Sequence, residues 1–179
     1  MVDKKSLYER GKTAASGELP HLLGQVVEFP DVNWSSTEPV KPALSGATVH
    51  CRWVMNDSGG ALLPGQTVVY KTGYALQRIV DETATSGETP VGVVDEYLPS
   101  AGVANGECFW IVIEGPGKCL NEASGTCTEF VAVKAGTTTG GRVETNASTP
   151  GVTDVGWAME TTSTAGALFR VFIKLRQGG

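Results

Sequence analysis

From Leu44 to the C-terminus, the chain is a succession of short apolar segments separated by turn residues, and this spacing constrains its fold more than any other feature. The segment VHCRWVM (49–55) alternates as a half-buried strand must, with His50 and Arg52 on one face and Val49, Cys51, Trp53 and Met55 on the other. Similar strands are expected at 24–29, 66–71, 74–80, 91–97, 107–114, 129–134, 155–160 and 167–175. Short strands joined by Thr, Gly and Ser loops predict an all-β fold, a small β-barrel or β-sandwich, with almost no helix.

Three of these segments carry more specific predictions. The segment ECFWIVIE (107–114) is apolar on both faces, which is typical of a central strand. In the last segment, Arg170 and Lys174 face away from Phe169, Val171, Ile173 and Leu175. In the segment before it, Val155, Trp157 and Met159 share one face, so Trp157 is expected to be buried, as is Trp110.

Part of the chain is repeated. VGVVDE (91–96) and VGWAME (155–160) both begin with Val-Gly and end in Glu, and each is followed by a polar loop and an apolar run. In those runs, GECFWIVI and GALFRVFI, Phe109 matches Phe169 and Ile113 matches Ile173. The pattern predicts a strand-loop-strand unit present twice. Duplication and convergence of two hairpins both explain it, because many hairpins share this pattern.

Residues 1–45 differ from the rest of the chain. Four prolines interrupt the segment, and apart from 24–29 it shows no sustained period. A proline-rich, weakly patterned segment of this length does not bury a core of its own. We therefore expect an extended N-terminal arm over 1–45 and a β-barrel or β-sandwich domain over 46–179.

Charge and apolar content exclude several partners. The formal net charge is −5, whereas nucleic-acid phosphates are bound by clustered cations. No stretch approaches the roughly 18 consecutive apolar residues of a membrane span. The charged N-terminus, MVDKKSLYERGK, differs from the apolar region of a secretory signal. We expect no direct nucleic-acid partner, no membrane partner, and synthesis in the cytoplasm.

The cysteines and histidines form no metal-binding pattern. Cys51, Cys108, Cys119 and Cys127 lack CxxC spacing, and only His21 and His50 could complete a site, so no metal or other cofactor is expected. Cys119 and Cys127 flank a short loop, where reduced thiols and a disulfide both remain open.

Catalytic motifs are missing as well. The turn before Gly117-Lys118 resembles a phosphate loop, but Val112 stands where the first glycine belongs and Cys119 replaces the hydroxyl residue. The acidic pairs Asp81-Glu82 and Asp95-Glu96 put neighbouring carboxylates on opposite faces and are interpreted as solvated charges. Neither histidine stands in a pattern that would activate a nucleophile. The sequence gives no reason to expect an enzyme.

Four stretches of the chain resemble the capsid decoration, or cement, proteins of tailed bacteriophages. They are LLPGQTVVYKTG (62–73), VGVVDEYLPSAGVANGECFWIVIEGPGKC (91–119), VKAGTTTGGRV (133–143) and VGWAMETTSTAGALFRVFIKL (155–175). Turn glycines and Val-Gly-apolar strands recur in this order in that family, over roughly residues 60–176 here. The long N-terminal segment has no counterpart in the family pattern.

The resemblance implies a structural virion protein that binds the outside of the assembled capsid lattice of the major capsid protein. It also implies a homotrimer or another homo-oligomer. If the arm makes the attachment, the expected capsid or subunit contacts are its apolar and aromatic residues and one arginine: Leu7, Tyr8, Arg10, Leu22, Leu23, Phe29 and Trp34. An alternative interpretation is that Phe29 and Trp34 cover one open end of the barrel.

Two other functions remain open at this point. A phage tail or head-fibre protein would also be rich in β-structure and free of catalytic motifs. A carbohydrate-binding β-sandwich, from a different class, would use exposed aromatic residues such as Trp34, Trp110 and Trp157. The expected burial of Trp110 and Trp157 argues against it.

Overall fold

The computed structural model describes residues 9–15, 22–74, 79–82, 87–122, 125–146, 151 and 153–175. The predicted all-β class is confirmed, since eleven strands form one sheet and no α-helix occurs among the described residues. Within those residues there is accordingly no apolar helix of membrane-spanning length. The strands are β1 (Thr13–Ala14), β2 (Val26–Val32), β3 (Ala43–Asn56), β4 (Thr67–Tyr70), β5 (Ile79–Glu82), β6 (Gly92–Val94), β7 (Cys108–Leu120), β8 (Ala132–Ala135), β9 (Val143–Thr145), β10 (Asp154–Ala158) and β11 (Leu168–Lys174).

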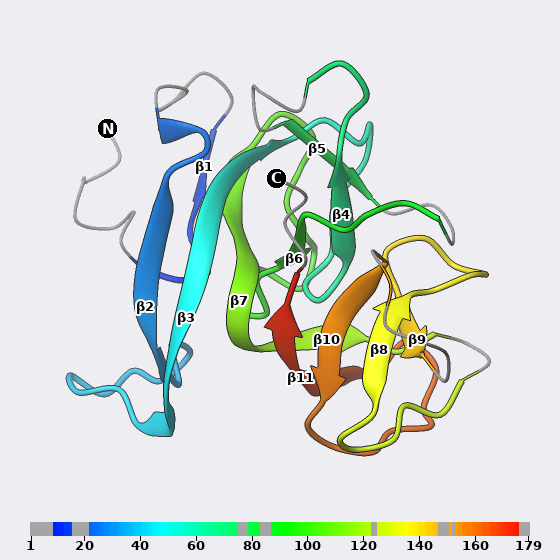
Figure 1. Ribbon diagram of the computed structural model, residues 1–179. Coiled ribbons are helices and arrows are strands. Elements are labelled where there is room, and N and C mark those ends of the chain that lie inside the picture. The colour runs from blue at the N-terminus through cyan, green and yellow to red at the C-terminus, as the bar shows by residue number, and fades with distance from the viewer. Residues whose placement is uncertain are drawn as a thin grey trace.

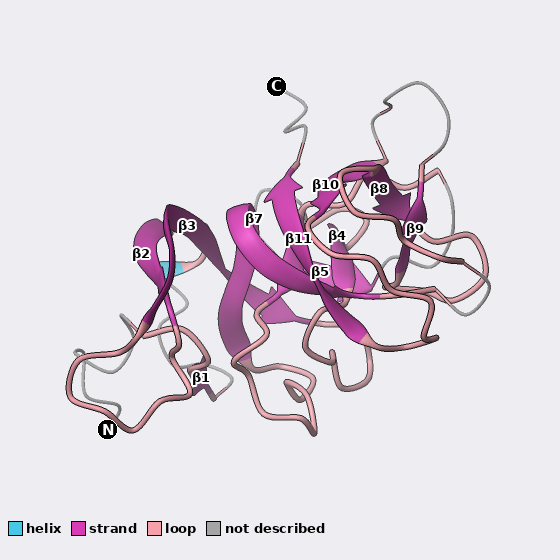
Figure 2. Ribbon diagram, turned by 90° about the horizontal axis from the view of Figure 1, so that it is seen from below, coloured by secondary structure: helices cyan, strands magenta, loops and turns pink. Residues whose placement is uncertain are grey.

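The sheet closes on itself twice. In the first ring, β3 pairs with β5, β5 with β4, β4 with β6 and β6 with β7, and β7 returns to β3. In the second ring, β7 pairs with β11, β11 with β10, β10 with β8 and β8 with β9. A parallel bridge between Asn121 and Val143 joins this ring back to the end of β7. The long, curved β7 therefore belongs to both rings (Figures 1 and 2).

The two rings have the same construction. We call β3, β4, β5, β6 and residues 108–113 the first unit, and residues 114–120, β8, β9, β10 and β11 the second unit. The pair Val93 and Val112 in the first unit corresponds to Trp157 and Phe172 in the second. The predicted strand-loop-strand repeat is thus confirmed, with both hairpins in the same register.

The repeat extends beyond those hairpins. Val68 faces Gly92 across β4 and β6, as Val133 faces Gly156 across β8 and β10. The equivalences continue through the other strand pairs. Val69 with Asp81 corresponds to Lys134 with Glu144, Val54 with Phe109 to Cys119 with Phe169, and the bridge of Leu62 with Val103 to that of Cys127 with Thr162. Every strand of the first unit therefore has a counterpart in the second.

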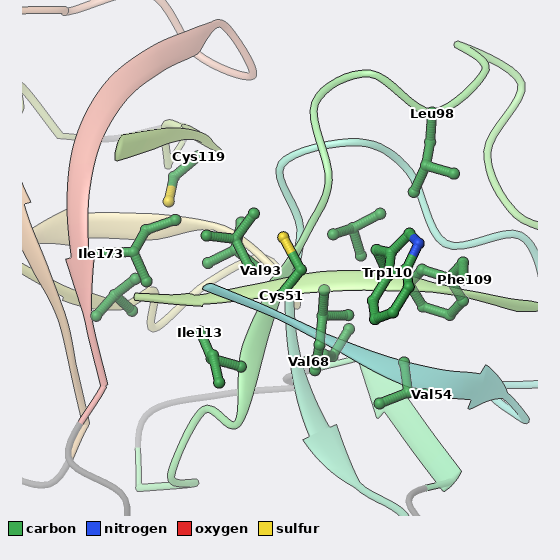
Figure 3. Packing of buried hydrophobic residues seen from close by; sticks show 14 of the residues in the cluster. Cys51, Val54, Val68, Val93, Leu98, Phe109, Trp110, Ile113, Cys119 and Ile173 are labelled. Carbon is green, nitrogen blue, oxygen red and sulfur yellow. The ribbon is translucent and has the colours of Figure 1, made fainter. Parts of the chain in front are cut away.

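The core follows the predicted strand faces. On β3, Val49, Cys51 and Trp53 are buried while His50 and Arg52 are half-buried. On β11, Phe169, Val171 and Ile173 are buried and Lys174 is exposed. Strand β7 is central as predicted, because it pairs with β1, β3, β6 and β11 and is buried on both faces over residues 108–113. Figure 3 shows residues of both units in one packed cluster.

The prediction that Trp157 is buried was wrong. Trp157 is 46% exposed and Met159 is 39% exposed, whereas Val155 and Ala158 are buried. The register of β10 against β8 shifts between Asp154 and Gly156. An irregularity of this kind changes which side chains point inward, so Val155 and Trp157 no longer share a face. Trp110, in contrast, is buried as predicted.

The segment predicted as an N-terminal arm pairs with the first unit through two strands. Strand β2 pairs with β3 from Val26 to Val32, and β1 pairs with β7. Strand β3 begins at Ala43, so the hairpin of β2 and β3 spans the predicted boundary at residues 45 and 46. At its end, residues 33–47 form a projecting tip (Figure 1) on which Val40 is 83% exposed and Leu44 is 44% exposed.

Candidate functional site

The described residues among those predicted to contact a capsid are buried or partly buried. Leu7 and Tyr8 lie outside the described residues, as does His21. Arg10 and Phe29 are each only 3% exposed, and Leu22, Leu23 and Trp34 are partly buried against the core. The five described residues therefore contribute to the packing of the protein itself.

Phe29 and Trp34 belong to an aromatic cluster on the outer face of the first unit. The ring centroids of Phe29 and Trp110 are 5.6 Å apart, those of Phe29 and Trp34 are 5.7 Å apart, and those of Trp53 and Trp110 are 4.8 Å apart. All three pairs meet edge to face, an arrangement that stabilises aromatic pairs beyond their buried area. Phe29 and Trp34 thus cover an outer face of the first unit, whereas the alternative interpretation placed them over one open end of the barrel. We call residues 9–15 and 22–42 the N-terminal cover.

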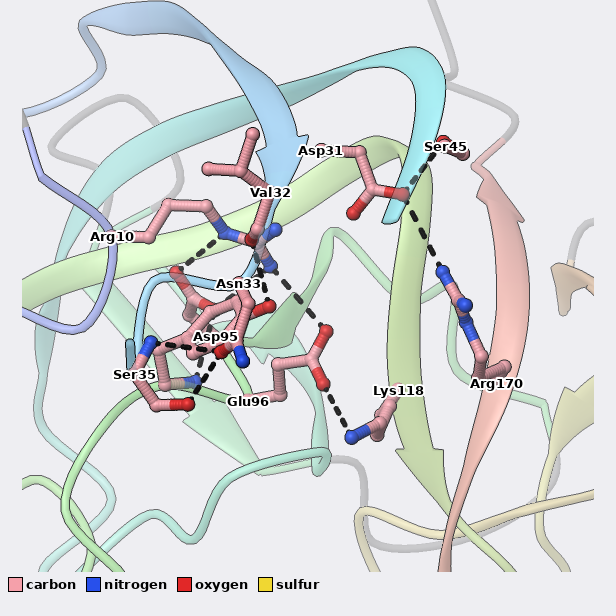
Figure 4. Close-up of polar contacts among 11 residues, drawn as sticks. Arg10, Asp31, Val32, Asn33, Ser35, Ser45, Asp95, Glu96, Lys118 and Arg170 are labelled. Carbon is pink, nitrogen blue, oxygen red and sulfur yellow. Dashed lines mark hydrogen bonds and ion pairs between the residues drawn. The ribbon is translucent and has the colours of Figure 1, made fainter. Parts of the chain in front are cut away.

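A buried ion pair fastens the start of this cover to β6 (Figure 4). Arg10 donates from Nε and Nη2 to the two carboxylate oxygens of Asp95, at 3.0 and 2.9 Å. Burial lowers the pKa of Arg10, but the attraction of Asp95 outweighs it, so the pKa is raised and the guanidinium stays charged. Tyr97, beneath the Arg10 guanidinium, donates its hydroxyl to the Val32 carbonyl at 3.0 Å.

The interpretation of Asp95 and Glu96 as solvated charges was wrong. Asp95 is fully buried, and the Glu96 side chain is 9% exposed. Glu96 lies 3.9 Å from the Arg10 guanidinium and accepts from Lys118 Nζ at 2.9 Å. The two carboxylates therefore join the N-terminal cover, β6 and β7 through charge pairs.

All four cysteines are buried free thiols. Cys119 and Cys127 occupy the places in the second unit that Val54 and Leu62 occupy in the first. Burial raises the pKa of Cys119, and it raises the pKa of Cys108 to about 11. The thiols are thus small core side chains, and their protonated form is favoured.

The described residues contain no group of three or more His, Cys, Asp or Glu side chains arranged to hold a metal ion. His50 lies between two carboxylates on the outer face of β3. Its Nε2 is 3.6 Å from Glu28 and its Nδ1 is 3.5 Å from Glu114. Its two carboxylate contacts are those of a surface ion pair.

A shallow groove of about 370 Å³ lies where the two units meet. Its lining is mostly apolar, from Leu63, Leu98, Leu120 and Leu168, with Glu96 at one side. Because Glu96 is already engaged by Lys118, this groove presents little directed polar chemistry to a small ligand.

The second unit carries an exposed apolar surface that the sequence did not predict. We call Phe130, Ala132, Trp157, Met159 and Phe172 the outer patch. Phe130 is 82% exposed, its amide donates to the Ala158 carbonyl at 2.8 Å, and Trp157 lies beside Ala132 in the neighbouring strand. The rings of Trp157 and Phe172 are 6.5 Å apart. The sequence pattern does not reveal this patch, because it places Trp157 on the core face and Phe130 in an ordinary strand.

Two exposed apolar surfaces stand out among the described residues. Those surfaces are the outer patch and the tip of the hairpin formed by β2 and β3. Comparison with known proteins gave no match, either to a model of a protein family or to a curated relative.

Proposed function

We propose that this protein is a structural virion protein that binds the outside of an assembled phage capsid lattice and stabilises it. The observation that carries the proposal is where the four stretches resembling decoration proteins fall in the fold. Residues 62–73 and 133–143 contain the equivalent strands β4 and β8, and residues 91–119 and 155–175 contain the equivalent hairpins. The resemblance thus follows the repeated unit of the fold.

Lattice-specific binding is sufficient for such a role. A protein that binds only the assembled shell shifts the equilibrium toward assembly, without any chemistry of its own. The rigid, doubly closed sheet suits this task, since little of it has to become ordered on binding.

The hairpin tip is our candidate for the shell contact. Of the residues that the sequence suggested, the described ones pack within the protein, which leaves Leu7 and Tyr8 as candidates. The tip adds Val40 and Leu44, whose side chains are exposed at the end of a projecting hairpin. Two prolines, Pro39 and Pro42, restrict the backbone of this loop and so reduce the entropy lost on binding.

The copy number of the polypeptide in purified source particles tests the role. Quantitative mass spectrometry against the most abundant shell protein should give a ratio near one or a simple fraction such as one third. A handful of copies per particle would instead indicate a tail or head-fibre protein.

Rebinding to particles stripped of this protein tests the contact. We expect V40K/L44K, and separately deletion of residues 1–8, to reduce binding if each makes shell contacts. Tyr74→Lys, an exposed residue on another loop, is the matched control. Unchanged binding by both variants would sink the assignment of the hairpin tip and the N-terminus. Deleting residues 1–40 would not test the shell contact alone. It would also expose Trp110 and remove Arg10, the partner of the buried Asp95.

One observation favours a second candidate, a carbohydrate-binding module. The expected burial of Trp157 argued against it, but Trp157 is 46% exposed and Phe130 lies nearby with 82% of its surface exposed. Exposed aromatic faces of this kind stack on sugar rings. Binding on a glycan array that is lost in Trp157→Ala would support this candidate over the virion role.

A further inference from the structure

The geometry points to the outer patch as a self-association surface that binds a second copy of this chain. The equivalent surface of the first unit is bound by the second unit of the same chain. This inference concerns the isolated protein and does not rest on the proposed virion role. It follows from comparing equivalent surfaces of the two units.

The counterparts of the outer patch in the first unit are all buried. By register, Phe130 corresponds to Gly65, Ala132 to Thr67, Trp157 to Val93 and Phe172 to Val112. Thr67 and Val93 are completely buried and Val112 is 1% exposed. The same surface is therefore covered in one unit and open in the other.

The second unit supplies much of the cover in the first. Leu120 donates its amide to the Gly65 carbonyl at 3.0 Å, and Thr67 donates its amide to the Gly141 carbonyl at 2.7 Å. A Cβ at Gly65 would run into the Leu168 side chain, and one at Gly117 would lie 3.7 Å from Val112. This surface of the first unit is thus an interface within the chain.

A neighbouring surface of the first unit is covered by the N-terminal cover instead of by the second unit. At this surface the first unit has aromatic residues and the second unit has charged ones. In the first unit, Trp53 and Trp110 pair across β3 and β7, and Phe29 of the N-terminal cover packs on Trp110. The equivalent pair in the second unit is Lys118 and Arg170, which form ion pairs with Glu96 at 2.9 Å and with Asp31 of the N-terminal cover at 3.4 Å.

Uncovered faces at the end of a repeat array need polar residues for solubility. The second unit has the charged residues Lys118 and Arg170 at the place where the first unit packs Phe29 on Trp110. It has Phe130, Trp157 and Phe172 where the first unit is covered by the second unit. A second copy of this chain is therefore the occupant that the pattern favours for the outer patch. Closed homo-oligomers are the common outcome of self-association.

The backbone of Phe130 gives independent support. Its φ is 63°, and it is the one non-glycine residue with a positive φ in the described part of the chain. A bulky residue in this region is strained, and strained residues concentrate at functional sites. Its equivalent, Gly65, has a φ of 81° without that strain. Because the Phe130 side chain is 82% exposed, it adds little to the core that would offset the strain.

The test measures the mass of the purified full chain by light scattering on a size-exclusion column, over a range of concentrations. The wild type should have a mass that is a multiple of 18.7 kDa. F130S/W157K should have the mass of one chain, with an unchanged far-ultraviolet spectrum. Met159→Glu, a milder change in the same patch, should lower the mass at the same concentrations if the double variant folds poorly.

V40K/L44K is the matched control, because it also replaces two exposed apolar residues, at the hairpin tip. It should keep the mass of the wild type. A monomeric wild type at the highest soluble concentration, or an unchanged mass for both patch variants, would overturn the inference. A monomer that binds glycans through Trp157 would do the same and assign the patch to carbohydrate. Loss of particle binding by V40K/L44K with an intact oligomer would separate the two proposals.

Discussion

Asn56 and Asn121 stand at equivalent places in the two units, and each donates two hydrogen bonds from its side-chain amide to loop carbonyls. Asn56 donates from Nδ2 to the carbonyls of Gly60 and Val103, at 2.9 and 2.8 Å. Asn121 donates from Nδ2 to the carbonyls of Gly125 and Thr164, at 3.0 and 3.1 Å. Both asparagines are completely buried and each holds two loops together at the end of a strand.

Replacing either asparagine with alanine should destabilise the protein by a similar amount. Each change removes two side-chain hydrogen bonds at a completely buried site, and each such bond contributes about 0.5–1.5 kcal/mol. The free energy of unfolding in urea measures the effect. Asn105→Ala removes an exposed hydrogen bond to Gly59 and should cost much less. An Asn121→Ala variant as stable as the wild type would contradict the equivalence of the two loops.

Replacing Gly65 with alanine should lower the free energy of unfolding, whereas replacing Phe130 with glycine should raise it slightly. Gly65→Ala forces a side chain into a positive φ and places its Cβ 3.2 Å from the Leu120 amide nitrogen. We expect a loss of about 2–4 kcal/mol, from backbone strain and overpacking together. Phe130→Gly removes the strain at an exposed site, and the added freedom of the unfolded chain offsets part of the gain. Its stability should lie within about 1 kcal/mol of wild type, on the stable side.

Arg10 and Asp95 should behave as one unit. Arg10→Met leaves a buried carboxylate without its partner, and breaking a buried pair in this way costs about 3–5 kcal/mol. Arg10→Met with Asp95→Asn should cost less than the sum of the single changes, because the uncompensated charge is gone. Lys12→Met, in the exposed pair with Glu9, should change stability by about 0.5 kcal/mol or less. Additive effects in urea unfolding would show that the pair is not coupled.

Stability should fall in alkaline solution because of the buried thiols. Burial raises the pKa of Cys119 above its ordinary value near 9, so the unfolded chain loses this proton at lower pH than the folded chain does. The stabilising contribution is complete below about pH 9 and decreases as the pH rises beyond it, by up to about 1.4 kcal/mol per pH unit for each thiol. Tyr97, whose pKa burial raises to about 12, adds to the decrease at higher pH.

Cys119→Val tests this directly. The equivalent residue in the first unit is Val54, so the side chain should fit. Urea unfolding under reducing conditions, at several pH values between about 8 and 10.5, should show a flatter pH dependence for the variant than for the wild type. Equal slopes would mean that Cys119 does not ionise on unfolding in this range.

The strands could be predicted from the sequence because their signal is local. Alternation on β3 and β11 and the turn residues between strands depend only on neighbouring positions. The position of Trp157 could not be predicted in this way, since the register shift in β10 depends on how that strand pairs with β8.

The packing of Phe29 on the outer face of the first unit could not be predicted, because its aromatic partner Trp110 is distant in the sequence. One signal was present. Residues 107–114 are apolar on both faces, which requires something to cover the outer face, and the unassigned N-terminal segment was available for it.

The full extent of the repeat could not be predicted for a different reason. Equivalent residues are 65 positions apart at Asn56 and Asn121 but 60 apart at Phe109 and Phe169, so no constant period exists. Loops of different length between the strands cause this drift. Few identical residues besides turn glycines and strand valines mark the equivalence, and hydrogen-bond register reveals it.

Strand β7 passes from the first ring into the second without a linker. Domains joined by a linker can unfold one at a time, whereas each ring here would lose one of its own edges if the other came apart. The whole sheet should therefore melt in a single transition, with equal calorimetric and van't Hoff enthalpies. It also means that neither ring can be cut out as an independently folding fragment. Folding must bring together strands from β3 to β11 before either ring is complete.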